Sequence, residues 1–462
     1  MSIEITDLSI YKHIHLIGIG GVSMSAIAET LNNWNYFVTG SDLSQSIITD
    51  NLNKHGIKTV IGHDVETAKK ADLIIYSAAI SDSDPEIIAA KENNIPLIDR
   101  GSFVGYLTKL YKEAICIAGT HGKTTTTSML SICFINGNMD PTIEVGAILD
   151  QIGGNYRIGN SEYFILESCE YKGNFLKFVP NTAIILNMDN DHLDYYKTFD
   201  NIVKTFNCFA KNVEENGLLV TNADDPNCYN LKNVVSSKFI SYGIENEEAD
   251  FVAKNITYNN NGFASFDVYK NGNLYTSINL SVAGKHNVLN ALACIAVCDY
   301  YGINKEIVSS SLKSFTGAER RLEYKGSLPN NVSIFDDYAH HPTEIKAIAN
   351  AIKNKKFNKS WVIFQPHTYS RTKLLLDDFA DALSNFDNIV LLDIYAAREK
   401  DPLDISSKDL EAKLTLKNKN VKYIPNFDEA TAFIKESVNR DDIIITLGAG
   451  TVTKLGPMLL EK

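Results

Sequence analysis

Residues 115–130 read ICIAGTHGKTTTTSML, an apolar run followed by a glycine turn and a threonine-rich segment. This order predicts a β-strand, a phosphate-binding loop and the start of a helix. The common loop pattern G-x-x-x-x-G-K-[ST] would place a glycine at position 117, but the chain has Ile117 there, and its first glycine is Gly119. The stretch is therefore either a threonine-rich helix start without a ligand or the loop of a different family of ATP-using enzymes.

The residue types in the loop favour the second reading. In a phosphate loop, backbone N–H groups cradle the phosphate oxygens, a lysine reaches the β- and γ-phosphates, and a hydroxyl holds Mg²⁺. Lys123 and Thr124 stand at the lysine and hydroxyl positions. We therefore expect an ATP site here.

Length and charge limit the classes of function. The 462 residues are enough for about three domains. The formal net charge, 44 − 56 = −12, argues against a nucleic-acid partner, because phosphate binding there depends on many cations. The seven cysteines form no C-x-x-C pair, which is typical of reduced thiols. No stretch approaches the ~18 apolar residues of a membrane span, and the N-terminus lacks a signal-peptide core. We expect a soluble cytoplasmic protein without membrane insertion.

Strand-like apolar runs alternate with helical stretches along most of the chain, which predicts an α/β fold with parallel sheets. The residues at 270–273, KNGN, predict the turn of an antiparallel hairpin, and 284–302 predict a long helix. We place three domains at 1–108, 109–317 and 318–462.

A glycine cluster follows the first predicted strand. Gly18, Gly20 and Gly21 resemble a dinucleotide fingerprint, and Asp42 stands about 20 residues beyond, where a ribose-binding acid is expected. Ser23 and Met24 fall where the last glycine would stand, so the pattern is incomplete. NAD, another diphosphate nucleotide such as a UDP-sugar, and a glycine turn without a ligand all remain open.

Polar side chains also follow several later strands. Glu167 could reach a metal near the phosphates, whereas His192 could equally be a loop residue, because Mg²⁺ prefers oxygen ligands. In the last third, His367 and Arg371 are four residues apart, on one face if that segment is helical. The carboxyl ends of parallel strands are where α/β sheets hold ligands, so we expect a site there.

Six motifs then carry a resemblance to a known family. AGTHGKTTT (118–126), DHLDYY (191–196), GKHNVLNALA (284–293), GAERRLE (317–323), DDYAHHPTEI (336–345) and FQPHTYSRT (364–372) resemble the Mur ligases of peptidoglycan synthesis. The resemblance covers essentially the whole chain. That family has the compact loop G-x-x-G-K-[ST]-[ST], so the motif at 119–125 is intact.

The resemblance implies a fold and a reaction. The three domains would be an N-terminal Rossmann-like UDP-binding domain, a central P-loop ATPase domain with a parallel sheet plus a small antiparallel sheet, and a C-terminal Rossmann-like amino-acid-binding domain. ATP would phosphorylate the carboxylate of UDP-N-acetylmuramate to an acyl phosphate, which the amine of L-alanine would attack. Mg²⁺ or Mn²⁺ would assist. The chain would be a monomer or weak homodimer.

The resemblance also implies residue roles. ATP would contact Gly119, Thr120, His121, Gly122, Lys123, Thr124, Thr125, Asn287, Asn290, Arg320 and Asp337. The UDP group would contact Gly18, Gly20, Gly21, Asp42, His63 and Ser77. L-alanine would contact Tyr338, His340, His367 and Arg371. The metal ligands would be Thr124, Glu167 and His192. The catalytic residues would be Lys123, His192, Arg320, His340, His367 and Arg371.

The chain departs from the family pattern at two informative places. Ser23 replaces a glycine of GIGGxGM, and Cys169 replaces an aspartate in ESCEYKGNF (167–175), which leaves the role of Glu170 open. The alternatives are a murein-recycling ligase that adds a tripeptide to UDP-N-acetylmuramate, a regulatory member of the fold, and an NAD-dependent oxidoreductase. The oxidoreductase would have no use for the central loop.

Overall fold

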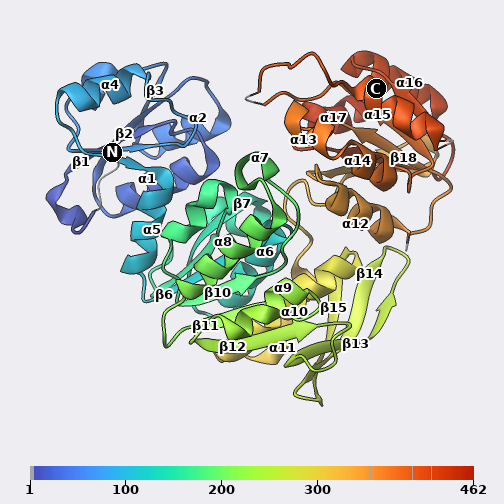
Figure 1. Ribbon diagram of the computed structural model, residues 1–462, viewed down its shortest axis with the longest axis horizontal. Helices are drawn as coiled ribbons and strands as arrows, with labels where there is room; N and C mark the ends of the chain where they lie inside the picture. The colour runs from blue at the N-terminus through green and yellow to red at the C-terminus, as the bar shows by residue number, and fades with distance from the viewer. Residues whose placement is uncertain (1–4, 354, 398, 418, 462) are drawn as a thin grey trace. The chain divides into compact units, whose positions relative to one another are not determined.

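The computed structural model describes residues 5–353, 355–397, 399–417 and 419–461 (Figure 1). The chain divides into two compact units. The first comprises Met1–Met188 and Phe199–Ser241, and the second comprises Asp189–Thr198 and Tyr242–Lys462. Each is described separately. Within the described residues, no helix combines the length and apolar character needed to cross a membrane.

The first unit opens with a five-stranded parallel sheet in the order β3-β2-β1-β4-β5. The strands are β1 (His13–Ile17), β2 (Phe37–Asp42), β3 (Lys58–Ile61), β4 (Leu73–Tyr76) and β5 (Leu97–Asp99). The helices are α1 (Val22–Asn33), α2 (Ile47–Lys54), α3 (Val65–Ala68), α4 (Pro85–Glu92) and α5 (Arg100–Leu110). The strand order reverses direction at β1, so the loop after β1 lies at the switch point where such sheets bind ligands.

The same unit contains strands of a second sheet in the order β11-β10-β6-β9-β7-β8. They are β6 (Glu113–Ala118), β7 (Thr142–Leu149), β8 (Gly154–Arg157), β9 (Tyr163–Glu167), β10 (Thr182–Ile185) and β11 (Leu218–Asn222). The central strand β6 is parallel to both neighbours, and β8 is antiparallel to β7. The helices are α6 (Lys123–Asn136), α8 (Phe199–Lys211) and α9 (Pro226–Tyr229).

Strand β12 (Lys238–Gly243) begins in the first unit and ends in the second, where it pairs with β13 (Phe251–Tyr258). Strands β14 (Phe263–Lys270) and β15 (Asn273–Ala283) form the predicted hairpin. Its turn residues have φ angles of 48° and 79°, the positive values that an Asn-Gly turn adopts. The predicted long helix is α10 (Lys285–Tyr300), and α11 (Lys305–Ser314) follows.

The last sheet has the order β16-β17-β21-β18-β19-β20, and only β16 is antiparallel to its neighbour. The strands are β16 (Glu323–Leu328), β17 (Val332–Asp337), β18 (Ser360–Phe364), β19 (Asn388–Leu391), β20 (Asn420–Tyr423) and β21 (Ile443–Leu447). Besides α10 and α11, the helices of this unit are α7 (Leu193–Tyr196), α12 (Pro342–Ile352), α13 (Tyr369–Leu374), α14 (Leu376–Leu383), α15 (Ser407–Leu416), α16 (Phe427–Ser437) and α17 (Leu455–Leu460).

Strand β18 shows why the four residues Trp361–Phe364 are all apolar. Val362 and Phe364 belong to one core, together with residues of α12, α14 and α15. Trp361 and Ile363 belong to another core, together with residues of α16 and α17. Successive side chains of a strand point to opposite faces, so a strand covered on both faces is apolar at every position.

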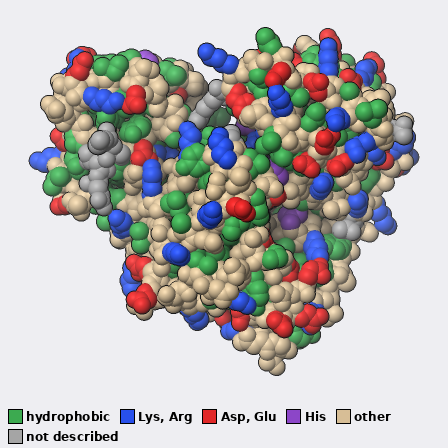
Figure 2. Space-filling model, in the orientation of Figure 1, with side chains coloured by type: hydrophobic (Ala, Val, Ile, Leu, Met, Phe, Trp, Pro, Cys, Tyr) green, Lys and Arg blue, Asp and Glu red, His purple; other side chains and the backbone are tan. Residues whose placement is uncertain are grey.

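Short 3₁₀ helices complete the chain. They are η1 (Leu8–Ile10), η2 (Asp150–Ile152), η3 (Tyr171–Lys177), η4 (Asn230–Asn233), η5 (Pro329–Asn331) and η6 (Thr451–Lys454). The α/β class is confirmed, whereas the exact domain boundaries stay predictions. On the face shown in Figure 2, lysine and arginine side chains are interspersed with acidic ones.

Candidate active site

The glycine loop after β1 lies against the ends of β2 and β4. The Gly18 N–H donates to the Ser41 carbonyl at 2.8 Å, and the Gly20 N–H donates to Asp42 Oδ2 at 2.9 Å. A Cβ on Gly20 would lie 2.9 Å from that same oxygen, and one on Gly18 would lie 3.2 Å from the Cβ of Ser77. The loop therefore brings together the predicted glycines, Asp42 and Ser77 at the N-terminus of α1.

His63 follows β3, the strand beside β2. Its Nδ1 lies 3.6 Å from Asp84 Oδ2, and the ring is partly exposed. It belongs to the same edge of the sheet as Asp42, but its nearest charged partner is at the start of α4. Its role toward the UDP group stays a prediction.

The phosphate loop has the backbone that its glycines predict. Gly119 has a φ of 143° and Gly122 a φ of 86°, and both values lie in the region that favours glycine. Gly122 is the N-cap of α6, and within the described part of the chain no side chain caps this helix. The first-turn N–H groups of a helix bind anions readily, so this end suits phosphate.

Asn187 holds this loop, and sequence reasoning missed it. Its Oδ1 accepts the His121 N–H at 2.8 Å, and its Nδ2 donates to the His121 carbonyl at 2.9 Å. The Thr120 N–H donates to the Asn187 carbonyl at 3.1 Å. Asn187 follows β10, which pairs with β6, so only the strand pairing brings it to the loop.

The lysine of the loop is paired with Glu170. The Lys123 ammonium lies 2.9 Å from Glu170 Oε2 and also donates to the Thr120 carbonyl at 3.1 Å. The two side chains are 16% and 4% exposed, so the pair is mostly shielded from water. Burial acts to lower the pKa of Lys123, but the nearby acidic groups, Glu170 first among them, together outweigh it and the pKa is raised. Glu170, whose role the altered motif left open, thus holds the lysine in its charged form.

The predicted metal ligands of this unit also meet. Thr124 Oγ1 donates to Glu167 Oε1 at 2.8 Å, and the Gly146 N–H donates to Glu167 Oε2. A Cβ on Gly146 would lie 2.5 Å from that oxygen, so a larger residue there would displace the Glu167 carboxylate. A hydroxyl and a carboxylate beside a phosphate loop are oxygen ligands of the kind Mg²⁺ prefers. These residues therefore fit the metal.

In the second unit, the predicted adenine-side residues lie in the first two turns of α10. Asn287 and Asn290 are 7% and 6% exposed. Asn287 Nδ2 donates to the Ala283 carbonyl at 2.8 Å, and Asn290 Nδ2 donates to Asn287 Oδ1 at 3.0 Å. The pair is thus fixed in place by its own hydrogen bonds.

Arg320 is held at the ends of β17 and β21. Its Nε donates to Asp336 Oδ2 at 3.1 Å, its Nη2 donates to the Gly448 carbonyl, and its guanidinium lies 4.9 Å from the centre of the Tyr338 ring. Asp337 is 4% exposed and accepts N–H groups from Leu322 and Ala339. Burial raises the pKa of Asp337 to about 7.

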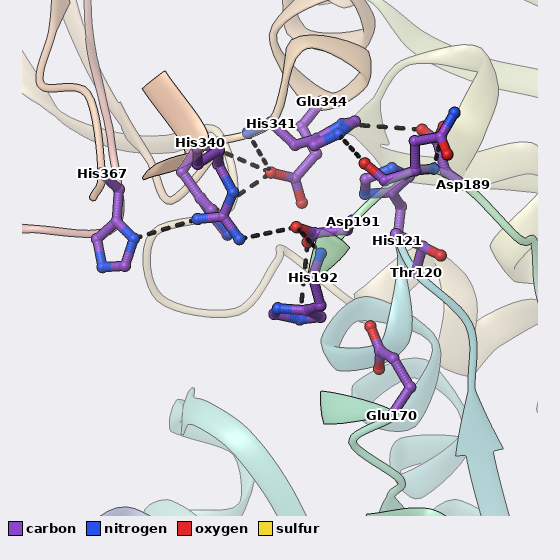
Figure 3. Close-up of polar contacts among 12 residues, drawn as sticks. Thr120, His121, Glu170, Asp189, Asp191, His192, His340, His341, Glu344 and His367 are labelled. Atoms are coloured by element: carbon purple, nitrogen blue, oxygen red, sulfur yellow. Dashed lines mark hydrogen bonds and ion pairs between the residues drawn. The ribbon is translucent and has the colours of Figure 1, made fainter. Parts of the chain in front are cut away.

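Three of the residues predicted to bind L-alanine, His340, His367 and Arg371, form a connected cluster, of which Figure 3 labels the two histidines. Arg371 Nη2 donates to Asp191 Oδ1 at 2.8 Å, and its Nη1 lies 3.2 Å from His367 Nδ1. The His367 ring lies 5.7 Å from the His340 ring and 5.8 Å from the Tyr395 ring. His367 precedes α13 with Thr368 as the N-cap, so the two residues meet across a helix start and not along one helical face. The segment is not helical at His367, so the expected shared helical face of His367 and Arg371 does not form.

Both histidines of this cluster are neutral at neutral pH. Burial lowers the pKa of His340, and burial together with the charges of His340 and Arg371 lowers the pKa of His367 to about 4. Asp191 behaves in the opposite sense. Burial acts to raise its pKa, but Arg371, His192 and His340 together outweigh this, Arg371 most strongly, and hold the pKa well below its usual range.

His192, the third predicted metal ligand, is the N-cap of α7 with a φ of 53°. Its Nε2 lies 3.7 Å from Asp191 Oδ2. The same carboxylate therefore touches the predicted metal-ligand histidine and the predicted amino-acid-binding arginine. In the sequence, Asp191 belongs to a D-x-D-H run, and that run did not show which of the two aspartates contacts His192 and Arg371.

Three family descriptions match successive parts of the chain. The Mur ligase family catalytic domain matches residues 13–112, the Mur ligase middle domain matches 117–298, and the Mur ligase glutamate ligase domain matches 320–450.

Relatives match over nearly the whole length. The chain is 45% identical over 459 residues to the UDP-N-acetylmuramate–L-alanine ligase of Acetivibrio thermocellus, covering 99% of this chain and 98% of the relative. It is 48% identical over 452 residues to the ligase of the same name from Clostridium beijerinckii, covering 97% and 98%. Among solved structures, the UDP-N-acetylmuramate-alanine ligase of Thermotoga maritima matches with a TM-score of 0.82 and 29% identity, covering 97% of this chain and 98% of that one.

Proposed function

The chain belongs to the Mur ligase family, and from this premise we propose that it joins L-alanine to the carboxylate of UDP-N-acetylmuramate at the expense of ATP. The observation that carries the assignment is the full-length match, at 45% and 48% identity, to ligases named for this reaction. The reaction supplies a precursor of peptidoglycan.

The first step transfers the γ-phosphoryl group of ATP to the muramyl carboxylate, giving ADP and an acyl phosphate. Both reactants are anions, so fixed positive charge must offset their repulsion. Lys123 supplies such a charge at the start of α6, where the helix N-terminus adds its own. Glu170 keeps the lysine charged and near the loop until phosphate oxygens can take its place.

Mg²⁺ suits this site, and Thr124 and Glu167 would hold it. When bound, it would supply positive charge between the phosphates and the carboxylate. His192, in the second unit, is the proposed ligand of a second ion. We propose that Asn287, Asn290, Arg320 and Asp337, also in the second unit, bind the nucleoside end of ATP.

In the second step the amine of L-alanine attacks the acyl carbon, and the C–O bond to the phosphate breaks, releasing inorganic phosphate and leaving the amide. A proton must leave the ammonium first. His340 Nδ1 lies 3.0 Å from the Tyr338 carbonyl, which can only accept, so Nδ1 carries the proton and Nε2 is free to take one. His367 Nδ1 faces the donor Arg371, so its proton lies on Nε2. We assign the base to His340 Nε2. The carboxylate of L-alanine would pair with Arg371.

The experiment measures ADP release from the purified protein with UDP-N-acetylmuramate and a divalent metal, adding L-alanine, glycine, L-serine or the muropeptide tripeptide in turn. We expect turnover with L-alanine and no effect of NAD(H). Turnover only with the tripeptide would transfer the assignment to the recycling ligase. Steady ATP hydrolysis without the nucleotide sugar would contradict the acyl-phosphate route.

A cytoplasmic location fits the requirement for ATP and a nucleotide sugar, and it is part of the proposal. A monomer or weak homodimer is proposed as well. Sedimentation of the purified chain over a range of concentrations would test the oligomeric state.

A further inference from the structure

Arg100 is the first residue of α5 and has a fixed backbone. Asp99, the N-cap, accepts the Ser102 N–H at 3.1 Å and pairs with the Lys177 ammonium at 2.5 Å. The Asp99 carboxylate therefore caps the first turn of α5 and also forms an ion pair with Lys177. None of the roles assigned above involves Arg100.

The Arg100 side chain extends to the glycine loop. Its Nη1 donates to Ser23 Oγ at 3.0 Å, and Ser23 is the second residue of α1, two positions beyond Gly21. The Asn155 amide donates to the Val22 carbonyl at 3.0 Å and holds the same turn. The guanidinium thus lies at the N-terminus of α1.

The charge of Arg100 has no close counterpart. Among the described residues, none offers it a carboxylate within ion-pair distance, although the side chain is partly buried. Glu144 interacts with the charge of Arg100 from beyond ion-pair distance, and burial raises the pKa of its carboxyl group despite a hydrogen bond from Ser23. A partly buried guanidinium outside an ion pair carries a desolvation cost that an anionic ligand would offset.

We propose that Arg100 binds the diphosphate of the nucleotide sugar, with Ser23 as the residue that positions the guanidinium. This rests on the proposed function for the identity of the ligand. A guanidinium can pair two phosphate oxygens at once, and the N-terminus of α1 adds backbone donors beside it. Ser23, where the family pattern has a glycine, gives the arginine an anchor that glycine lacks.

The test is calorimetry on the full chain with UDP, UDP-N-acetylmuramate and ATP. Arg100→Ala should weaken UDP and UDP-N-acetylmuramate alike by about 10- to 100-fold and leave ATP within about 2-fold. Arg100→Lys should restore part of the loss, because an ammonium keeps the charge and loses the paired geometry. Arg440→Ala, which removes an arginine whose side chain is 82% exposed, is the control and should change nothing.

Ser23→Ala tests positioning separately and guards against a folding defect in the arginine variants. It should raise KM for UDP-N-acetylmuramate about 2- to 5-fold while kcat at saturation stays unchanged, since the anchor acts on binding alone. Unchanged UDP affinity in folded Arg100→Ala would overturn the proposal. Weakened UDP-N-acetylmuramate with unchanged UDP would overturn it too, because the arginine would then bind the muramyl part. A wild-type chain that bound neither ligand would instead contradict the proposed function.

Discussion

At the scale of single residues, the central feature is that two site cations are already paired with carboxylates of the same unit. Lys123 is paired with Glu170, and Arg371 is paired with Asp191. Each cation is proposed to bind an anionic substrate group, a phosphate or a carboxylate. The carboxylate of the protein therefore keeps the cation ionised and in position before the substrate binds. It occupies the place that the anionic group of the substrate is proposed to take.

Glu170→Gln should destabilise the ligand-free protein by about 1–3 kcal/mol, because it leaves a shielded ammonium without its counter-charge. MgATP should restore part of that stability, since phosphate oxygens replace the lost carboxylate. Urea unfolding with and without MgATP measures both effects. Glu162→Gln removes the partner of Lys112 from an exposed pair and should cost less than about 0.5 kcal/mol. Equal losses in the two variants would remove the special role of Glu170.

Arg371→Ala should raise KM for L-alanine about 30- to 1,000-fold, because a charge-assisted contact to the carboxylate of a very small substrate is lost. UDP-N-acetylmuramate affinity, measured by calorimetry, should barely change, and Arg371→Lys should recover only part of the loss. If the nucleotide-sugar affinity fell while KM for L-alanine stayed the same, Arg371 would belong to the other substrate.

The low pKa of His367 has a consequence for stability. The folded ring titrates at about 4, against 6.5 for an ordinary histidine, so between these values the unfolded chain binds a proton that the folded chain does not. The part of the unfolding free energy that depends on His367 is therefore complete above pH 6.5, and it is lost as the pH falls toward 4. His367→Gln should therefore flatten the fall in unfolding free energy over this window by on the order of 1–3 kcal/mol. An unchanged pH profile would show that the ring has the same pKa in the folded and unfolded chains.

At the scale of elements, sequence reasoning succeeded where the cause is local. Local backbone preferences explain the strand, glycine turn and helix at 113–136. They also explain the Asn-Gly hairpin, because the residues that determine each of these elements are close together in the sequence. The contacts of Asn187 with the phosphate loop and of Asp191 with Arg371 could not be predicted. They join residues 66 and 180 positions apart, and they depend on strand pairing and on how a loop folds back.

Gly122→Ala tests the link between the turn and α6. A φ of 86° costs a residue with a side chain about 1–2 kcal/mol, and relaxing it would move the N–H groups that face the phosphates. ATP affinity should fall at least about 10-fold while UDP affinity stays unchanged. Gly153→Ala is the matched control, because Gly153 has a φ of 72° and open space around its Cα. Both variants should lose similar stability, and only Gly122→Ala should lose ATP binding.

At the scale of the whole molecule, the proposed ATP contacts are divided between the two units. The phosphate loop at 119–125 belongs to the first unit, whereas Asn287, Asn290 and Arg320 belong to the second. The UDP residues all belong to the first unit, and the L-alanine residues all belong to the second. Each ligand should therefore slow hydrogen exchange in a different set of segments of the two units.

Hydrogen exchange followed by mass spectrometry would measure these differences. MgATP should slow exchange in the phosphate-loop peptides of the first unit and also in peptides covering 284–290 and 318–338 of the second, because bound ligand stabilises the folded state of every segment it contacts. UDP should slow exchange only in the first unit, around 18–24, 42–63, Ser77 and Arg100. Lys123→Ala should abolish both ATP effects and leave the UDP effect intact, which serves as the internal control. If MgATP protected the phosphate loop alone, the adenine roles of Asn287 and Asn290 would be wrong, while the phosphate-loop assignment would stand.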